Sequence, residues 1–114
     1  MTDLNGLTMF VSATANTGVV SRDTRLCFIQ RGSRVAARYA GGRVVRGWLV
    51  GTWVGSRLHF RYLQCEEGSC IHGGVSVAAV EQQPDGRVRL IEHFTWTTRP
   101  GSGTNVFDEC PSTP

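Results

Sequence analysis

One strand-like stretch of the chain carries a carboxylate in the middle of an otherwise apolar face. Residues 87–98 lie between the turn-forming segments 84–86 and 99–103, as a strand bounded by turns would. Because side chains alternate across a strand, one face carries Val88, Leu90, Glu92, Phe94 and Trp96. Burying an isolated carboxylate there is costly, so Glu92 must be paired, hydrogen-bonded or protonated. Desolvation would raise its pKa, which makes Glu92 a candidate acid or base near neutral pH.

The other positions predicted to face inward are mostly apolar and aromatic. Together with Glu92 they are Leu26, Phe28, Val35, Ala37, Tyr39, Leu49, Trp53, Leu58, Phe60, Tyr62, Phe94 and Trp96. Only Tyr39, Tyr62 and Glu92 are polar among them. This composition fits a packed interior in which the two phenols satisfy Glu92, and it fits a small-molecule pocket equally well.

The nucleophilic and metal-ligating residues form weaker patterns. Cys65 and Cys70 flank four residues, so we expect them opposite each other across a hairpin, at a Cα separation of about 4.5–5.5 Å that a disulfide tolerates. Three alternatives stay open for this pair: two free thiols, a disulfide, or a partial metal site that includes His72. Three ligands at this spacing are too weak a pattern to predict a zinc centre. His59 and His93 share faces with arginines, so we expect them to be exposed. No nucleophile elbow and no phosphate-binding loop is present.

The elements that position these residues are short alternating runs separated by glycine-containing turns. No window shows apolar residues at helical spacing with a capping signal. We expect strands over residues 7–13, 23–31, 34–40, 43–54, 57–64, 70–83, 87–98 and 104–109. The pairs Gly32-Ser33, Gly41-Gly42 and Gly55-Ser56 are typical of two-residue hairpin turns. Gly47 and Gly51 lie inside the long strand predicted over residues 43–54, where they predict a bulge or a sharp bend.

Such short turns make consecutive strands antiparallel neighbours, which predicts an up-and-down meander. The fold class is therefore all-β, in one domain over residues 1–114 of which 111–114 form a short tail. About eight strands that closed would enclose side chains or one small ligand. We expect a calycin-like barrel. The alternative is an open, curved sheet that forms a dimer through its concave face.

Charge and hydropathy limit the kinds of partner that we expect for the protein. No apolar run approaches the roughly 18 residues of a membrane span, so we expect no membrane partner. The first ten residues lack a secretory pattern, which predicts a cytoplasmic protein with reduced thiols. All 12 basic residues are arginine, and Asp23 is the single acid between Arg22 and Arg61. If the third to fifth strands are adjacent, Arg34, Arg38, Arg57 and Arg61 form one convex patch. The aromatic residues alternate opposite to the arginines, so nucleic acid is an unlikely partner.

Several short motifs in the later two-thirds of the chain occur together in a known group of proteins. They are Tyr39–Gly42, Gly47–Gly51, Tyr62, Asp85–Glu92, Trp96-Thr97 and Asp108-Glu109. Through them the stretch from Tyr39 to Glu109 resembles small bacterial proteins that carry the label N-acetylglutamate synthase. The chain departs from this group between Cys65 and Glu81, and at Arg99-Pro100. The resemblance implies a shared family and fold.

The label itself would imply acetyl transfer from acetyl-CoA. In the common fold, that activity needs an Arg/Gln-x-x-Gly-x-Gly/Ala turn that opens a helix, so that backbone N–H groups meet the pyrophosphate. The nearest match, residues 38–43, ends in arginine and leads into a predicted strand. The residues therefore support the family and not that activity.

We interpret the chain as a small-molecule-binding β-barrel. It is a candidate cofactor-independent isomerase, cyclase or lyase that acts on an apolar substrate without a metal. Glu92 would serve as acid or base, and Tyr39 and Tyr62 as orienting or oxyanion-stabilising donors. The walls would be Phe28, Trp53, Phe60, Phe94 and Trp96. The alternative is a non-enzymatic binding or interaction module that uses the arginine-rich outer face. The sequence identifies neither the ligand nor the reaction, and a homodimer stays open.

Overall fold

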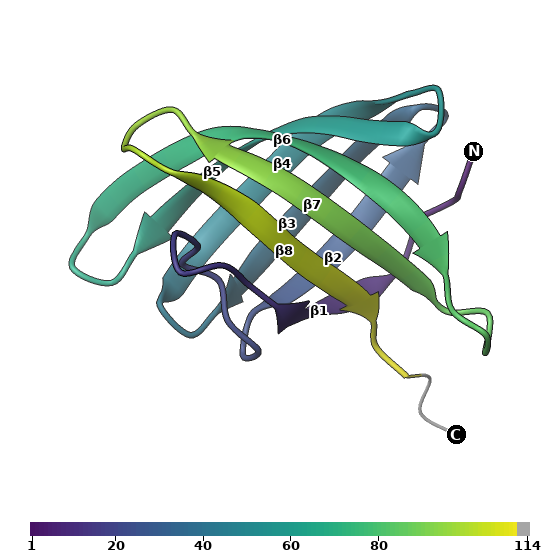
Figure 1. Ribbon diagram of the computed structural model, residues 1–114, viewed down its shortest axis with the longest axis horizontal. Helices are drawn as coiled ribbons and strands as arrows, with labels where there is room; N and C mark the ends of the chain where they lie inside the picture. Colours follow the sequence, from purple (N-terminus) through teal and green to yellow (C-terminus); the bar gives the residue numbers. More distant parts are fainter. Residues whose placement is uncertain (112–114) are drawn as a thin grey trace.

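The computed structural model describes residues 1–111, and in this part of the chain eight strands form one closed barrel (Figure 1). They are β1 (Thr8–Ala13), β2 (Arg25–Arg31), β3 (Arg34–Gly41), β4 (Val44–Val54), β5 (Arg57–Glu66), β6 (Cys70–Gln82), β7 (Val88–Trp96) and β8 (Ser102–Glu109). Each strand pairs antiparallel with the next, and β1 pairs with β8 to close the ring. The predicted all-β, calycin-like meander is confirmed, and the open-sheet alternative is wrong. Of the predicted tail, residues 112–114 lie outside the described residues.

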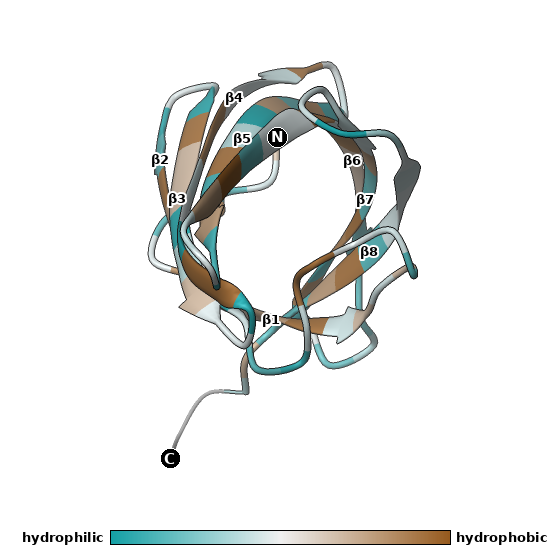
Figure 2. Cartoon of the chain, turned by 90° about the vertical axis from the view of Figure 1, so that its left-hand side faces the viewer, coloured by the Kyte–Doolittle hydropathy of each residue, from teal (hydrophilic) through white to brown (hydrophobic). Residues whose placement is uncertain are grey.

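Hydrophobic and hydrophilic residues alternate along the strands around the ring (Figure 2), and successive side chains of a strand point to opposite faces, so one set faces the interior and the other faces water. In β5, Leu58, Phe60 and Tyr62 are buried, whereas Arg57 and Arg61 between them are exposed. All of the residues predicted to face inward are buried. Within residues 1–111, no helix has the length and hydropathy needed to cross a membrane.

Two of the three predicted hairpin turns are confirmed and the third is displaced by one residue. Gly32-Ser33 and Gly55-Ser56 connect their strands, and both glycines have a φ of +60°, which suits glycine in a tight turn. Between β3 and β4 the connection is Gly42-Arg43 instead, because Gly41 is still paired with Val44. A Cβ at Gly41 would lie 2.0 Å from the carbonyl oxygen of Asp23, so close approach of the β1–β2 loop explains this glycine.

The predicted bulge in the long strand exists, but it lies at the start of β4 and not at Gly51. The register shifts between Val44 and Arg46 against β5, and between Val44 and Gly47 against β3. The two glycines also make room for aromatic residues. A Cβ at Gly47 would lie 2.4 Å from the Tyr39 ring, and one at Gly51 would lie 2.5 Å from Cβ of Phe60.

The barrel has two different ends. At the N-terminal end, the segment before β1 closes the interior: Leu4 is fully buried, and its N–H donates to Oε1 of Gln30 at 3.0 Å. The opposite end, here the cap end, carries the β1–β2 loop (residues 14–24) and the turns after β3, β5 and β7, to the left in Figure 1. Thr17 holds this loop against β7, because its carbonyl oxygen accepts a hydrogen bond from Nε1 of Trp96 at 2.8 Å.

The close approach at Gly51 leads to a stability prediction. We expect Gly51→Ala to lower the free energy of unfolding by about 1–3 kcal/mol, the usual cost of overpacking, because the new Cβ would lie 2.0 Å from the carbonyl oxygen of His59. The neighbouring Val50→Ala removes a side chain that is 65% exposed and should change stability by no more than about 0.5 kcal/mol. Urea denaturation measures both, and equal effects would contradict the close packing of β4 on β5.

Candidate functional site

A cavity of about 30 Å³ lies inside the barrel toward the cap end. One water needs about 10–15 Å³ of such volume, so the cavity accepts a few small atoms as it stands. It is lined by Gly18, Val19, Val20, Leu26, Tyr39, Leu49, Phe60, Tyr62, Gln64, Glu92, Phe94, Trp96, Asn105 and Phe107. All three predicted polar residues therefore line one cavity, together with Phe60, Phe94 and Trp96.

The other two predicted wall residues lie elsewhere. Phe28 and Trp53 are buried but do not line this cavity. Trp53 donates from Nε1 to Oε1 of Gln30 at 3.3 Å, the same oxygen that holds Leu4. These two aromatic residues therefore fill the N-terminal end of the barrel.

Glu92 is held by two neutral donors from the neighbouring strands. Ser76 on β6 donates to Oε2 at 2.6 Å, and Nδ2 of Asn105 on β8 donates to Oε1 at 2.9 Å. Thr14 completes the chain by donating to Oδ1 of Asn105 at 2.6 Å. The interpretation that Tyr39 and Tyr62 satisfy Glu92 is therefore wrong. Burial raises the pKa of Glu92, and the two hydrogen bonds, which favour the carboxylate, oppose that rise.

Tyr39 belongs to a second polar chain that runs toward the cap end. Its hydroxyl donates to Oε1 of Gln64 at 2.8 Å, and Nε2 of Gln64 donates to Oε2 of Glu66 at 2.9 Å. Arg99 donates to the same Glu66 oxygen and stacks on Trp96, with Cζ 4.3 Å from the ring centroid. The proton of Tyr39 is thus committed to Gln64, and burial together with the nearby Glu92 raises its pKa.

Tyr62 is the one cavity-lining phenol whose hydroxyl is unused. In the described residues its Oη is buried and has no hydrogen-bond partner. The ring packs edge-to-face on Trp96 at 5.3 Å, and Gly74 leaves the space that the hydroxyl occupies, since a Cβ there would lie 2.4 Å from Oη. Burial and the nearby Glu92 raise the pKa of Tyr62, so it keeps its proton. A buried donor without a partner costs about 1–3 kcal/mol, and an acceptor in the cavity would recover that energy.

The arrangement joins one free donor to one carboxyl group of raised pKa in a small, mostly apolar space. Such a site favours an uncharged guest with an acceptor atom, because mostly apolar walls do not replace the hydration that an ion loses on binding. It also has the parts of a proton-transfer site, since a desolvated carboxyl group whose pKa is raised can take or give a proton.

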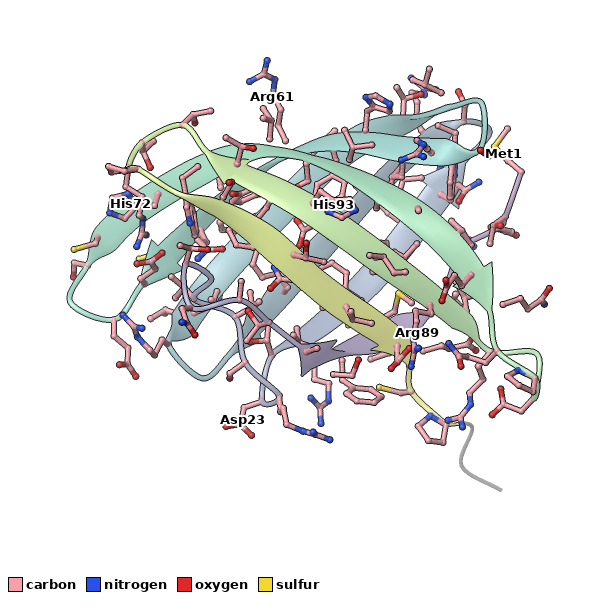
Figure 3. All side chains as sticks on the ribbon, in the orientation of Figure 1. Met1, Asp23, Arg61, His72, Arg89 and His93 are labelled. Atoms are coloured by element: carbon pink, nitrogen blue, oxygen red, sulfur yellow. The ribbon has the colours of Figure 1, made fainter. Side chains whose placement is uncertain are left out.

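The cysteine and histidine patterns give no second site. The register pairs Cys65 with Ile71 and Cys70 with Glu66, so the expectation that the two cysteines lie directly opposite is wrong by one residue. All four cysteines are free, and no metal-binding group of three His, Cys, Asp or Glu residues exists within residues 1–111. His59 and His93 are exposed as predicted. His72 lies at the cap end (Figure 3), with Nδ1 2.7 Å from Oγ1 of Thr98.

The predicted outer patch exists: Arg34 and Arg38 on β3 and Arg57 and Arg61 on β5 are all exposed, and the two strands flank β4. Figure 3 shows Arg61 pointing away from the barrel. Trp48 lies on the same face and is 49% exposed. The expectation that aromatic residues lie only opposite to the arginines is therefore wrong for Trp48.

The sequence analysis missed five buried polar residues. They are Thr24 in the β1–β2 loop, and Gln64, Glu66, Ser76 and Asn105 on the strands. Gln64 and Glu66 continue the alternation of Leu58, Phe60 and Tyr62. Gln64 lies within the predicted strand 57–64, and a strand longer by two residues would have included Glu66. Ser76 and Asn105 required the register of β6 and β8 against β7, which the sequence does not contain.

A protein-family model described as avidin-like protein matches residues 2–110 of the chain. No curated protein and no solved structure matches the chain. The family match agrees with a small calycin-like barrel, and it does not test the N-acetylglutamate synthase label.

The raised pKa of Glu92 determines whether the free energy of unfolding rises or falls with pH. The folded state holds this proton more tightly than the unfolded chain, so the stabilising contribution is complete below the unfolded pKa of about 4.3. It is lost as pH rises through the folded pKa. We expect the unfolding free energy of the native protein, relative to Glu92→Gln, to fall in urea denaturation as the pH rises above the unfolded pKa and through the higher folded pKa.

Asp108→Asn is the control of opposite sign. Hydrogen bonds from Arg89 hold the pKa of Asp108 below its usual range, so its contribution is present at neutral pH and is lost on acidification. If the native protein instead loses stability relative to Glu92→Gln as pH falls from about 7 to 4, Glu92 is a paired structural anion.

Proposed function

The chain belongs to the avidin-like family, and from that premise we propose that it binds a small organic molecule inside its barrel. The observation that carries the proposal is the unpartnered hydroxyl of Tyr62 in the wall of the internal cavity. Packed cores pair nearly all their buried polar atoms, so an unused donor beside an open space suits a ligand. A cytoplasmic setting is part of the proposal, and the four free cysteines agree with it.

The chemistry of the walls favours an uncharged ligand with a carbonyl-type oxygen. Tyr62 supplies a donor that stays protonated because burial raises its pKa. No cationic side chain is among the described residues that line the cavity, and Arg99 at the cap end is paired with Glu66, so an anionic guest would find no free counter-charge. The ligand oxygen would accept from Tyr62, and its apolar part would contact Leu49, Phe60 and Phe94.

The same pose supports a catalytic role as isomerase, cyclase or lyase. The ionised carboxylate of Glu92 would take a proton from the carbon next to the carbonyl, while the O–H of Tyr62 stabilises the enolate oxygen. Return of the proton to a different carbon, or loss of a leaving group, completes the reaction without a redox cofactor. Tyr39 positions Gln64 through its hydrogen bond and lines the cavity wall.

Binding can be tested with three four-atom probes of the same shape: acetone, 2-methylpropene and acetate. We expect acetone to shift the NMR signals of Tyr62 and Trp96 saturably, and Tyr62→Phe to weaken its binding by about 3- to 10-fold, the effect of one neutral hydrogen bond. Binding of 2-methylpropene should not change in this variant, and acetate should bind least. If no probe reaches the cavity signals, the proposed function fails.

The two phenols also differ in their effect on stability. Tyr62→Phe removes an unpartnered hydroxyl and should leave the empty protein as stable as before, or more stable. Tyr39→Phe leaves Oε1 of Gln64 without its donor and should cost about 1–2 kcal/mol. A loss of similar size for Tyr62→Phe would mean that its hydroxyl is a satisfied structural group.

Proton transfer can be tested by following deuterium exchange at the methyl groups of acetone in D₂O. We expect the protein to accelerate this exchange with a rate that rises with pH as Glu92 ionises, and Glu92→Gln to abolish the acceleration, a loss of about 100-fold or more for a general base. Glu67→Gln makes the same change at an exposed turn residue and should have no effect. Equal rates for both variants would rule out Glu92 as the base.

A further inference from the structure

The outer surface of the barrel has a hollow on β2, β3 and β4 that is lined by three arginines and a tryptophan. The lining includes Arg25, Cys27, Arg38, Ala40, Arg46 and Trp48, and the hollow has a volume of about 510 Å³. It is separated from the internal cavity by the wall of the barrel, since the side chains of the two sites alternate across the same strands.

The register of the sheet brings these residues together. Arg38 on β3 pairs with Cys27 on one side and with Trp48 on the other. Two residues farther along β3, Ala40 pairs with Arg25, and the register shift in β4 places Arg46 next to this position. Because Ala40 carries only a methyl group between longer side chains, it forms the floor of the hollow.

The charge of the hollow is unbalanced. The three ion pairs within residues 1–111 are Arg87–Asp85, Arg89–Asp108 and Arg99–Glu66, and none involves the arginines of the hollow. The outward positions of β2–β5 carry seven arginines and no carboxylate; the arginines are Arg25, Arg31, Arg34, Arg38, Arg46, Arg57 and Arg61. Like charges this close repel one another, and an anion of charge about −2 would relieve the repulsion.

Trp48 gives the hollow an aromatic wall. Its side chain is 49% exposed, and in the described part of the chain no aromatic or cationic group stacks on its ring. A free indole face next to guanidinium groups can stack on a planar ring whose phosphate the arginines bind. One site would thus recognise both parts of the same molecule.

We propose that this hollow binds a small aromatic phosphate ester of the nucleoside monophosphate class. The base stacks on Trp48, and the phosphate lies over Ala40 between Arg38 and Arg46. Arg25 lies at the edge of the hollow. Its Nη1 donates to the carbonyls of Arg22 and Thr24, and its Cζ lies 5.7 Å from the centroid of the Phe10 ring on β1, so it contributes only through its remaining N–H groups. This site does not depend on ligand binding inside the barrel.

The test uses adenosine monophosphate, with adenosine and inorganic phosphate as its two halves. Trp53 and Trp96 are buried, so acrylamide quenching of tryptophan fluorescence reports mainly on Trp48. We expect the monophosphate to protect Trp48 saturably and to bind more tightly than either half. We also expect Arg38→Gln to weaken binding by about 3- to 30-fold, as for a charge-assisted contact. Trp48→Leu lacks the fluorescent reporter, so its binding is measured by isothermal titration calorimetry alongside the native protein, and we expect it to lose the preference for the monophosphate over inorganic phosphate.

Arg57→Gln is the matched control, because it removes an arginine of the same face that does not line the hollow. Binding that falls equally in Arg38→Gln and Arg57→Gln would overturn the site in favour of diffuse attraction to the whole face. A single-stranded 12-nucleotide oligomer that binds far more tightly than the monophosphate, and depends on Arg57, would overturn it in favour of a strand-binding surface. Absence of saturable binding at about 0.15 M salt would also overturn it, since the arginines are then solvated without a ligand.

Discussion

Closure of the ring by β1 and β8 is the constraint on which the rest of the molecule depends. The contact is short: four residue pairs join the two strands, with a register shift between Val11 and Ala13. Without it, the inner faces of β6, β7 and β8 would form one side of an open sheet, and water would solvate Glu92. With it, the carboxyl group loses that water, and only Ser76 and Asn105 compensate. The raised pKa of Glu92 is therefore a property of the closed ring.

The interior combines two polar chains of different character. Thr14, Asn105, Ser76 and Glu92 are linked by neutral donors, so the carboxyl group can hold or release its proton without breaking an ion pair. Gln64, Glu66 and Arg99 include a full ion pair at the cap end, where water is near. The ion pair thus lies at the rim, and burial disfavours the ionised form of the deeper carboxyl group, which suits an uncharged guest.

Glycine and tyrosine cooperate in shaping the cavity. Tyr39 lies over Gly47 on the neighbouring strand, and Tyr62 lies over Gly74 in the same way. Each glycine leaves a space in the wall that accepts a phenol ring. The two hydroxyls differ in their hydrogen bonding, because the Tyr39 hydroxyl donates to Gln64 and the Tyr62 hydroxyl has no partner among the described residues. The two phenols are therefore chemically distinct, although their positions in the strands look equivalent.

The outer face of β2–β5 is cationic, in contrast to the mostly apolar interior. Its arginines alternate with exposed apolar side chains, among them Ile29, Trp48, Val50 and Leu63, whereas the described acids lie mainly on other parts of the molecule. Exposed apolar and cationic groups on one face are typical of a surface that meets another molecule. The barrel thus presents two separate chemistries, a neutral one inside and a cationic one outside, because a strand alternates its side chains between the two faces.

The sequence by itself determined the fold class, the antiparallel order of the strands and most of the apolar residues that face inward. These features follow from local rules: alternation has a period of two, and two-residue turns force neighbouring strands together. It also determined that Glu92 would be buried, since that residue lies between Leu90 and Phe94 on an apolar face. Only the tertiary structure decided the partners of Glu92, the commitment of Tyr39 to Gln64 and the isolation of Tyr62. Those contacts depend on register and on closure of the ring, which bring together residues as distant as Thr14 and Asn105, 91 positions apart in the chain. Such long-range pairings produce no periodic pattern in a single sequence, and so much of the apolar lining was predictable while the hydrogen bonds within it were not.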